Sequence, residues 1–419
     1  MLNSQSSRAK CAARRRVPRS SGRNFALSRH RPNIRPLGPD VNLGGCGGTS
    51  ASPGVDIVII DLDTVLAMTS TTRPTRLLSL LGLVGCLVAG LTACGGAADT
   101  AETAVSGAPQ APGRTSYPLT IENCGVEVTF DQAPTRAASL YQASTEILLS
   151  LGLADRMVGT STWFDPVLPQ LAADNATVPR LADNDPSLEA VLATEPDLVT
   201  SASAHTFTPA VVAERSRFAQ LGIPTYQSPS VCTGATVEGE TVTRAEPLGI
   251  ETLFQEITEL ARIFDVQERG ARLVDELRGR LAAATAKLNA TSEPTVAFWF
   301  SGVKTPYMAG CCSAPGMYAR EVGARNVFAD EREDWPEISW EAVVASDPDV
   351  LVLADLSRQR IDGDALTTKI EFLESNPATN RMRAVQGKRY VVMTGSELDP
   401  GIREIDAIEK LANGLATAR

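Results

Sequence analysis

A segment that occurs twice is the feature that most restricts how this chain of 419 residues can fold. Residues 187–201 read SLEAVLATEPDLVTS, and residues 339–353 read SWEAVVASDPDVLVL. Each copy begins with a serine that can cap a helix, continues with helix-forming residues, and passes through an acid-proline-aspartate turn into an apolar strand. The repeat predicts two lobes of like topology, each with a glutamate, Glu189 or Glu341, in the first turn of the corresponding helix.

Helix and strand patterns alternate along the chain from about residue 117 onward. The strand candidates are residues 137–141, 157–161, 197–200, 295–300 and 350–353, and the helix candidates are residues 144–152, 188–193, 315–322 and 340–345. Regular alternation of this kind is typical of α/β folds with parallel sheets. We therefore expect each lobe to contain a parallel sheet covered by helices.

Residues 249–288, between the two lobes, have a helical pattern. From residue 266 onward, apolar side chains recur at helical spacing, namely Ala271, Val274, Leu277, Leu281 and Ala284. At about 1.5 Å per residue this helix is roughly 33 Å long, enough to reach from one lobe to the other. An ordinary surface helix is the alternative.

Residues 68–94 carry the pattern of an export signal. Two arginines are followed by the apolar run 77–91 and then by the tetrad LTAC, which ends at Cys94. The run is too short to span a bilayer comfortably and suits the apolar part of a signal peptide. The tetrad resembles a lipoprotein cleavage site, so we expect Cys94 to be lipidated and to become the first mature residue. A short core helix that ends in cysteine is the alternative.

The charge of the chain excludes one class of partner. From Cys94 onward there are 27 Lys and Arg against 45 Asp and Glu. An acidic surface of this kind repels phosphate backbones, so we expect no nucleic-acid binding.

Four cysteines of the exported part can form disulfides in an oxidising compartment. Cys124, Cys232, Cys311 and Cys312 allow three pairings. A bond between Cys124 and Cys232 closes a loop of about a hundred residues, worth roughly 4 to 5 kcal/mol in the chain-entropy view. It leaves Cys311 and Cys312 free or joined to each other. No further Cys or His spacing accompanies this pair, so we expect no direct metal site.

The order of these segments behind the cleavage site resembles the substrate-binding lipoproteins of bacterial ABC importers, in the iron-siderophore and vitamin B12 class. The segments that carry the resemblance are residues 136–166, 186–199 and 335–353. It implies the class III periplasmic-binding-protein fold, with two Rossmann-like lobes and parallel sheets joined by a long linker helix. The divisions that we expect are a mis-annotated, disordered extension (1–67), a signal peptide (68–93), a flexible tether (94–116), an N-terminal lobe (117–264), the linker helix (265–290) and a C-terminal lobe (291–419).

The resemblance also gives the repeated glutamates a role. It implies that Glu189 and Glu341 dock against arginines on the two subunits of a membrane permease. A carboxylate is favourable in the first turn of any helix because of the helix dipole. Glu189 and Glu341 acting only as helix-start acids is therefore the alternative.

A bulky ligand is expected in the cleft between the lobes, at the carboxyl ends of the strands. The candidate ligand contacts are the aromatic residues Trp163, Phe164, Trp299, Phe300 and Trp335, the cations Lys304 and Arg403, and the hydrogen-bonding residues Tyr141 and His205. Tyr307 is a further hydrogen-bonding candidate, Arg180 and Arg244 are secondary cation candidates, and Trp340 is interpreted as a packing residue. Aromatic walls with a few cations suit a ferric siderophore, which is large and frequently anionic.

The sequence therefore predicts a lipid-anchored, monomeric receptor on the outer face of the cytoplasmic membrane. It is expected to capture an iron(III)-siderophore complex without a cofactor of its own and to pass it to an ABC permease dimer. The resemblance further implies that the lobes close by only a small movement. Cobalamin and haem are alternative ligands. An enzyme is not expected, because Walker A, G-x-S-x-G and H-E-x-x-H motifs are absent from the sequence. A secreted hydrolase that uses Glu397 and Asp399 is the rival from another class.

Overall fold

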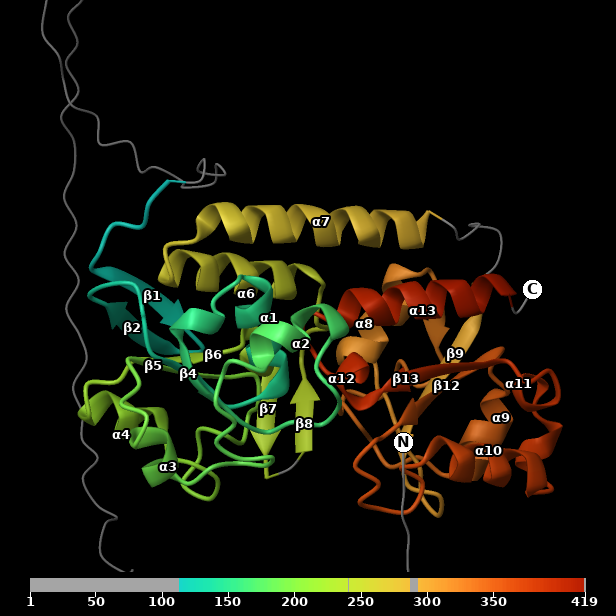
Figure 1. Ribbon diagram of the computed structural model, residues 1–419. Helices are drawn as coiled ribbons and strands as arrows, with labels where there is room; N and C mark the ends of the chain where they lie inside the picture. Colours follow the sequence, from blue (N-terminus) through green and yellow to red (C-terminus); the bar gives the residue numbers. More distant parts are fainter. Residues whose placement is uncertain (1–112, 240, 287–292, 418–419) are drawn as a thin grey trace, which may run out of the picture. The chain divides into compact units, whose positions relative to one another are not determined.

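The computed structural model describes residues 113–239, 241–286 and 293–417, drawn in colour in Figure 1. The expectations for the extension, the signal peptide, Cys94 and most of the tether lie outside these residues. Within the described ranges, no helix is long and apolar enough to cross a membrane.

The N-terminal lobe is built on a parallel sheet with the strand order β4-β3-β5-β6. Its strands are β3 (Ala137–Ser139), β4 (Met157–Thr160), β5 (Leu198–Ser201) and β6 (Thr225–Gln227). Its helices and short turns of helix are α1 (Gln142–Ser150), η1 (Ala154–Arg156), η2 (Pro169–Leu171), α2 (Ala172–Asn175), α3 (Leu188–Leu192), α4 (Arg215–Gln220) and α5 (Pro229–Cys232). Helix α1 ends as its sequence predicts, because Gly152 adopts the left-handed φ of +68° that a helix terminus of this kind requires.

The C-terminal lobe repeats this plan around the central strand β9 (Thr295–Ser301). Strands β12 (Val350–Asp355) and β13 (Tyr390–Thr394) continue the sheet in parallel, β11 (Arg325–Asn326) also pairs with β9 in parallel, and β10 (Tyr307–Met308) is an antiparallel edge. The helices are α8 (Ala314–Glu321), α9 (Trp340–Ser346), α10 (Leu366–Ser375), η3 (Thr379–Arg381), α11 (Arg383–Gln386), α12 (Gly395–Leu398) and α13 (Glu404–Thr417). The expected α/β lobes with parallel sheets are confirmed.

Helix α7 (Gln267–Thr285) is the long helix that the sequence predicts. Figure 1 shows it running beside α6 (Glu251–Ile263) at one end and beside α13 at the other. Near its start, Arg269 donates to the carbonyl oxygens of Leu151 and Gly152, at 3.2 and 2.9 Å. α7 begins one residue later than the apolar pattern, which starts at residue 266. It ends three residues before 288.

The far end of α7 is held by the C-terminal lobe. There Arg280 forms ion pairs with Asp406 and Glu409 of α13, the second at 2.8 Å. Leu277 and Ala284 are buried as the pattern predicts, whereas Ala271 is exposed. α7 therefore has polar attachments to both lobes.

One continuous apolar core lies beneath both sheets. It contains Ile147 from α1, Ile257 and Leu260 from α6, and Ile408 and Leu411 from α13, all fully buried. Two smaller cores lie on the opposite faces of the sheets, one under α3 and α4 and the other under α9 and α10. The lobes thus share a core on the α6 side of the sheets and have separate cores on the other side.

Two hairpins were not predicted. In the first, β1 (Leu119–Asn123) pairs with β2 (Val126–Phe130) through the two-residue turn Cys124-Gly125, and both turn residues have positive φ, as a type I′ hairpin requires. In the second, β7 (Ala235–Glu238) pairs with β8 (Thr241–Arg244).

Candidate functional site

A cavity of about 930 Å³ lies between the two lobes. The N-terminal lobe contributes Tyr141, residues 202–205, Ser230, Val231, Thr241, Val242 and Arg244. The C-terminal lobe contributes Phe300, Ser301, Tyr307, Glu331, residues 333–337, Ile361, Asp399 and Pro400. Much of this lining follows the carboxyl ends of β3, β5, β9 and β13, the edge at which open α/β sheets bind ligands.

Five of the predicted ligand contacts come together in this cavity, namely Tyr141, His205, Phe300, Tyr307 and Trp335. The rings of Phe300 and Trp335 lie 4.8 Å apart between centroids, inclined by 38°, and form an aromatic wall. Both are only partly buried, so their faces remain available to a ligand. Of the five aromatic residues predicted as ligand contacts, Phe300 and Trp335 line the cavity.

The Trp299 prediction is wrong. Its side chain is fully buried, and its Nε1 donates to the carbonyl oxygens of Ser301 and Gly302 at 2.9 and 3.1 Å. Successive residues of a strand point to opposite faces, so Trp299 faces the core while Phe300 faces the cavity. As predicted, Trp340 is a packing residue, and it meets Trp299 edge-on at 4.8 Å.

Trp163 and Phe164 also lie outside the lining of the large cavity. Trp163 is 5% exposed and its ring is covered by the guanidinium of Arg180 at 4.7 Å. Phe164 packs against Tyr141, with 5.2 Å between ring centroids, and lines a small void beneath it. Phe164 therefore supports Tyr141, and neither of these two aromatic residues forms the wall of the large cavity.

Neither predicted ligand cation lines the cavity. Arg403 is buried and paired with Glu146 of α1, its Nε and Nη2 donating to the two carboxylate oxygens at 2.7 and 2.5 Å. Burial works against the charge of Arg403, but the hydrogen bonds and charge of Glu146 outweigh it and raise the arginine pKa. Lys304 is exposed and lies away from the cavity. Both assignments are therefore corrected.

Arg244, a weaker candidate, does line the cavity, but it is occupied by protein groups. It is 4% exposed and contacts Asp334 of the other lobe at 2.9 and 3.0 Å. It also donates to the carbonyl oxygens of Ser230 and Thr233 at 2.9 and 3.1 Å. Arg244 therefore ties the lobes together at the edge of the cavity.

The two tyrosines of the cavity donate to carboxylates. The hydroxyl of Tyr141 donates to Asp399 at 3.1 Å, and that of Tyr307 donates to Glu337 at 2.8 Å. Burial raises the pKa of Asp399 to about 6, although the Tyr141 hydrogen bond opposes the shift. Burial, followed by the charge of Asp399, also raises the pKa of Tyr141.

Sequence reasoning missed several residues of the lining, chiefly Ile361 and the acidic residues of the segment 331–337. Ile361 is 56% exposed and lies in a loop after β12. The carboxylate of Asp364 shapes this loop, because it accepts from the backbone N–H groups of Arg360 and Ile361 at 2.7 and 2.9 Å. The position of Ile361 beyond the carboxyl end of a strand is the signal that would have identified it as a lining residue.

The repeated glutamates have matching local geometry. Ser187 and Ser339 each cap a helix, their Oγ atoms accepting from Ala190 N and Ala342 N at 3.2 Å in both cases. Glu189 and Glu341 are exposed in the first turns of α3 and α9. Figure 1 shows α3 and α9 on the side of the sheets away from α7.

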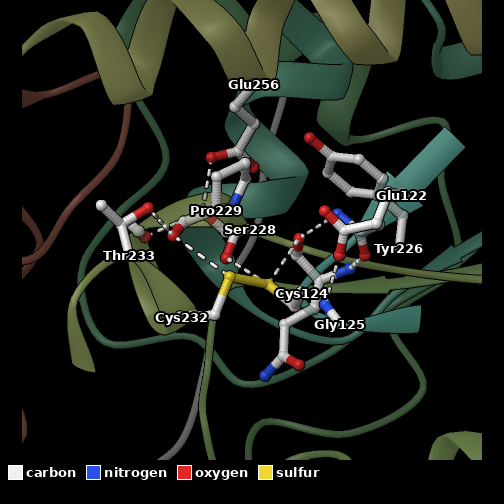
Figure 2. The surroundings of a disulfide bond; sticks show 12 residues. Glu122, Cys124, Gly125, Tyr226, Ser228, Pro229, Cys232, Thr233 and Glu256 are labelled. Atoms are coloured by element: carbon white, nitrogen blue, oxygen red, sulfur yellow. Dashed lines mark hydrogen bonds between the residues drawn. A yellow bond between two sulfur atoms is a disulfide. The ribbon is translucent and has the colours of Figure 1, made fainter. Parts of the chain in front are cut away.

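Two disulfides are present. Cys124 in the β1-β2 turn is bonded to Cys232 at the end of α5, and Figure 2 shows Ser228 and Glu256 beside this bond. The neighbours Cys311 and Cys312 form the second. Among the described residues, no group of three or more His, Cys, Asp or Glu side chains is placed to hold a metal ion.

Glu397 and Asp399, the two acids of the hydrolase alternative, make different contacts. Glu397 accepts from the backbone N–H of Thr394 at 2.8 Å and from Lys410 at 2.7 Å, at the start of α12. Asp399 faces the cavity and accepts from Tyr141.

Comparisons with known proteins agree with this geometry. Residues 138–397 match the Periplasmic binding protein family. A vitamin B12-binding protein of Vibrio campbellii is 28% identical over 297 residues, which cover 70% of this chain and 94% of that protein.

Two solved structures share the fold. A periplasmic binding protein of Veillonella parvula matches with a TM-score of 0.63 and 27% identity, over 71% of this chain and 97% of that one. A protein of Saccharomonospora viridis described as an ABC-type Fe3+-hydroxamate transport system matches with a TM-score of 0.58 and 27% identity, over 72% and 99%. With two parallel-sheet lobes joined by α7, the fold is that of the class III proteins. The chain belongs to the periplasmic binding protein family.

Proposed function

We propose that this protein captures an iron(III)-siderophore complex, of the hydroxamate class, between its lobes and delivers it to an ABC permease. The observation that carries the proposal is the cavity of about 930 Å³ between the lobes, with the aromatic pair Phe300 and Trp335 in its wall. Its volume lies at the upper end of the range for small-molecule sites and suits a bulky chelate. The Fe3+-hydroxamate description of the Saccharomonospora viridis protein supports the same ligand class.

Cobalamin is the second candidate ligand, favoured by the vitamin B12-binding relative in Vibrio campbellii. It is also large, so cavity volume does not separate it from a siderophore. Haem suits the volume as well, but its two propionates require cations. Within the described lining, the only lysine or arginine is Arg244, which Asp334 already neutralises.

The proposed protein carries out no chemistry. Metal is bound only as part of the chelate. After export, Cys94 anchors the chain to the outer face of the cytoplasmic membrane by lipid. The monomer then presents Glu189 and Glu341 to arginines on the two permease subunits.

Binding is tested with the purified mature chain by titration calorimetry and by quenching of tryptophan fluorescence, since Trp335 lines the cavity. The ligands are a ferric trishydroxamate, a ferric catecholate, cyanocobalamin and haem. We expect the hydroxamate to bind most tightly, at micromolar concentration or below. Tighter binding of cyanocobalamin would transfer the proposal to cobalamin, and no binding by any of them would refute it.

The docking role makes a separate prediction. The double variant Glu189→Ala, Glu341→Ala should reduce uptake of radiolabelled chelate into cells by about tenfold or more, since rim charges orient a complex and speed its formation. Its chelate affinity, measured on purified protein, should not change because neither residue lines the cavity. The variant Glu268→Ala, Glu276→Ala on the exposed side of α7 is the matched control. Normal uptake by the docking variant would contradict the assignment.

A further inference from the structure

The charged side chains that line the cavity are nearly all acidic. Five carboxylates line it, namely Glu331, Glu333, Asp334, Glu337 and Asp399. Among the described lining residues the only lysine or arginine is Arg244, and its guanidinium is fully engaged by Asp334 and two carbonyl oxygens. Four carboxyl groups therefore remain without a cationic partner.

The hydroxyl donors of the cavity do not offset this charge. Tyr141 and Tyr307 direct their O–H groups to Asp399 and Glu337. Within the described chain, the carboxylates of Glu331 and Glu333 have neither a hydrogen bond nor an ion pair. A ligand thus meets acceptors on this side of the cavity, and an anionic ligand would be repelled by them.

The acidic segment 331–337 is held in place by both lobes. Its backbone pairs with β8 of the other lobe, where Arg244 N donates to Arg332 O at 2.9 Å and Asp334 N donates to Val242 O at 2.8 Å. It also accepts from Cys311 N, which donates to Glu331 O at 2.7 Å. These bonds fix the backbone of the segment, and with it the positions from which its carboxylate side chains extend into the cavity.

The close packing of this segment depends on one glycine. A Cβ on Gly310 would lie 2.1 Å from the carbonyl oxygen of Glu333 and 2.6 Å from that of Glu331. Both distances are below van der Waals contact, so only glycine permits the chain to approach here. The backbone position of the acidic segment is therefore part of the fold.

Other arginines near the lobe boundary do not alter the lining. Arg358 and Arg360 both donate to Asn184 across the boundary, and Arg180 pairs with Asp183. None of the three lines the cavity.

We infer that the cavity selects a chelate that carries a positively charged group, such as a hydroxamate siderophore with a free ammonium, over neutral and anionic chelates. The inference rests on the proposed function and specifies its substrate class. The ammonium would lie against Glu331 and Glu333, while the apolar part of the chelate packs on Phe300 and Trp335.

The test uses one chelate scaffold in three charge states. A linear ferric trishydroxamate with a free ammonium is compared with its N-acetyl derivative, which is neutral, and its N-succinyl derivative, which is anionic. We expect the dissociation constant to rise at each step, by about tenfold or more from the cation to the anion, and the difference to shrink at high salt. The same comparison is made with a cobalamin that carries an added amine or an added carboxylate.

Two variants, one in the cavity and one on α7, test which residues cause the preference for the ammonium form. Glu331→Gln, Glu333→Gln should lose the preference for the ammonium form while still binding the acetylated form. Glu276→Gln on the exposed face of α7 should keep the preference. Equal binding of all charge states, or tighter binding of the anions, would overturn the inference while leaving the proposed function intact. No binding by any member of either series would overturn both.

Discussion

At the residue scale, the buried acid Glu256 is the clearest case of a side chain whose charged form is disfavoured by its surroundings. It lies on α6, is 3% exposed, and one carboxylate oxygen accepts from Ser228 Oγ at 2.5 Å. The other oxygen has no hydrogen-bond partner among the described residues. Burial raises the pKa of Glu256 to about 7 against the Ser228 hydrogen bond, with a further contribution from the charge of Glu259.

The groups that face Glu256 also favour its neutral form. Glu259 lies on the same helix, and Glu404 comes from the start of α13 across a small void. Burial first, and then the charge of Glu256, raise the pKa of Glu404 above its ordinary value. Two acids from different lobes therefore share a site where their charges oppose each other.

The variant Glu256→Gln should stabilise the protein at high pH. Because the pKa of Glu256 is raised in the folded state, its stabilising contribution is present below about pH 4.5 and is lost as pH rises through about 7. A neutral isostere avoids this loss, so the free energy of unfolding at pH 8 should increase by about 3 kcal/mol, with little change at pH 4.5. Urea unfolding at the two pH values measures it.

The exposed substitution Glu276→Gln serves as the control for Glu256→Gln and should show no such pH dependence. An equal effect of Glu256→Gln at both pH values would show that burial of the charge is not its cause.

At the residue scale, the sequence does not tell which of two neighbouring side chains faces the cavity and which faces the core. Trp299 and Phe300 lie in a strand buried on both faces, which reads as one continuous apolar run without alternation. The sequence therefore does not show which of these two side chains points into the cavity. Arg403 looked available because its partner, Glu146, is distant in sequence. The residues 331–337 resemble a solvated charged turn, and only the pairing with β8 makes them a wall of the cavity.

At the scale of elements, the sequence was more informative. Apolar runs in parallel strands and capped helices are local patterns, so the predicted strands and helices of both lobes lie within about three residues of the observed ones. The hairpins were missed for physical reasons. β7 and β8 are short, polar and largely exposed, and their pairing depends on contacts with the other lobe.

The Cys124–Cys232 bond links three elements that shape the cavity. It fixes the β1-β2 turn to α5 (Figure 2). Helix α5 contributes Ser230 and Val231 to the cavity lining. Beyond α5 the chain enters the β7-β8 hairpin, which carries Arg244. The bond therefore fixes α5, from which the chain continues into the hairpin that forms one side of the cavity.

Removing this bond with Cys124→Ala, Cys232→Ala should lower both stability and chelate affinity. The cysteines are 108 residues apart, and a loop of that length corresponds to roughly 4 to 5 kcal/mol of unfolding free energy. Chemical unfolding and titration calorimetry measure the two effects. Cys311→Ala, Cys312→Ala is the comparison, since a bond between neighbours restricts the unfolded chain little. Equal losses in the two variants would contradict the chain-entropy explanation.

At the scale of the whole folded unit, the boundary between the lobes is bound by polar contacts as well as by the shared core. Arg403 pairs with Glu146, and Arg244 pairs with Asp334. Asp165 accepts from Ser396 N at 2.7 Å. Breaking a buried ion pair by removing one partner typically costs about 3 to 5 kcal/mol. The contacts that hold the boundary would all have to rearrange in a wide hinge motion.

The lobes should therefore move little when a chelate binds. With spin labels on cysteines introduced at exposed positions of α3 and α9, the distance between labels should change by less than about 2 Å on saturation. The variant Glu146→Gln, Arg403→Met removes the deepest of the boundary ion pairs and should broaden the distance distribution of the free protein. Because a looser boundary must be ordered when the ligand binds, the variant should also bind the chelate more weakly. A change well above 2 Å in the native protein would mean that the shared core and ion pairs do not set the geometry of the cavity.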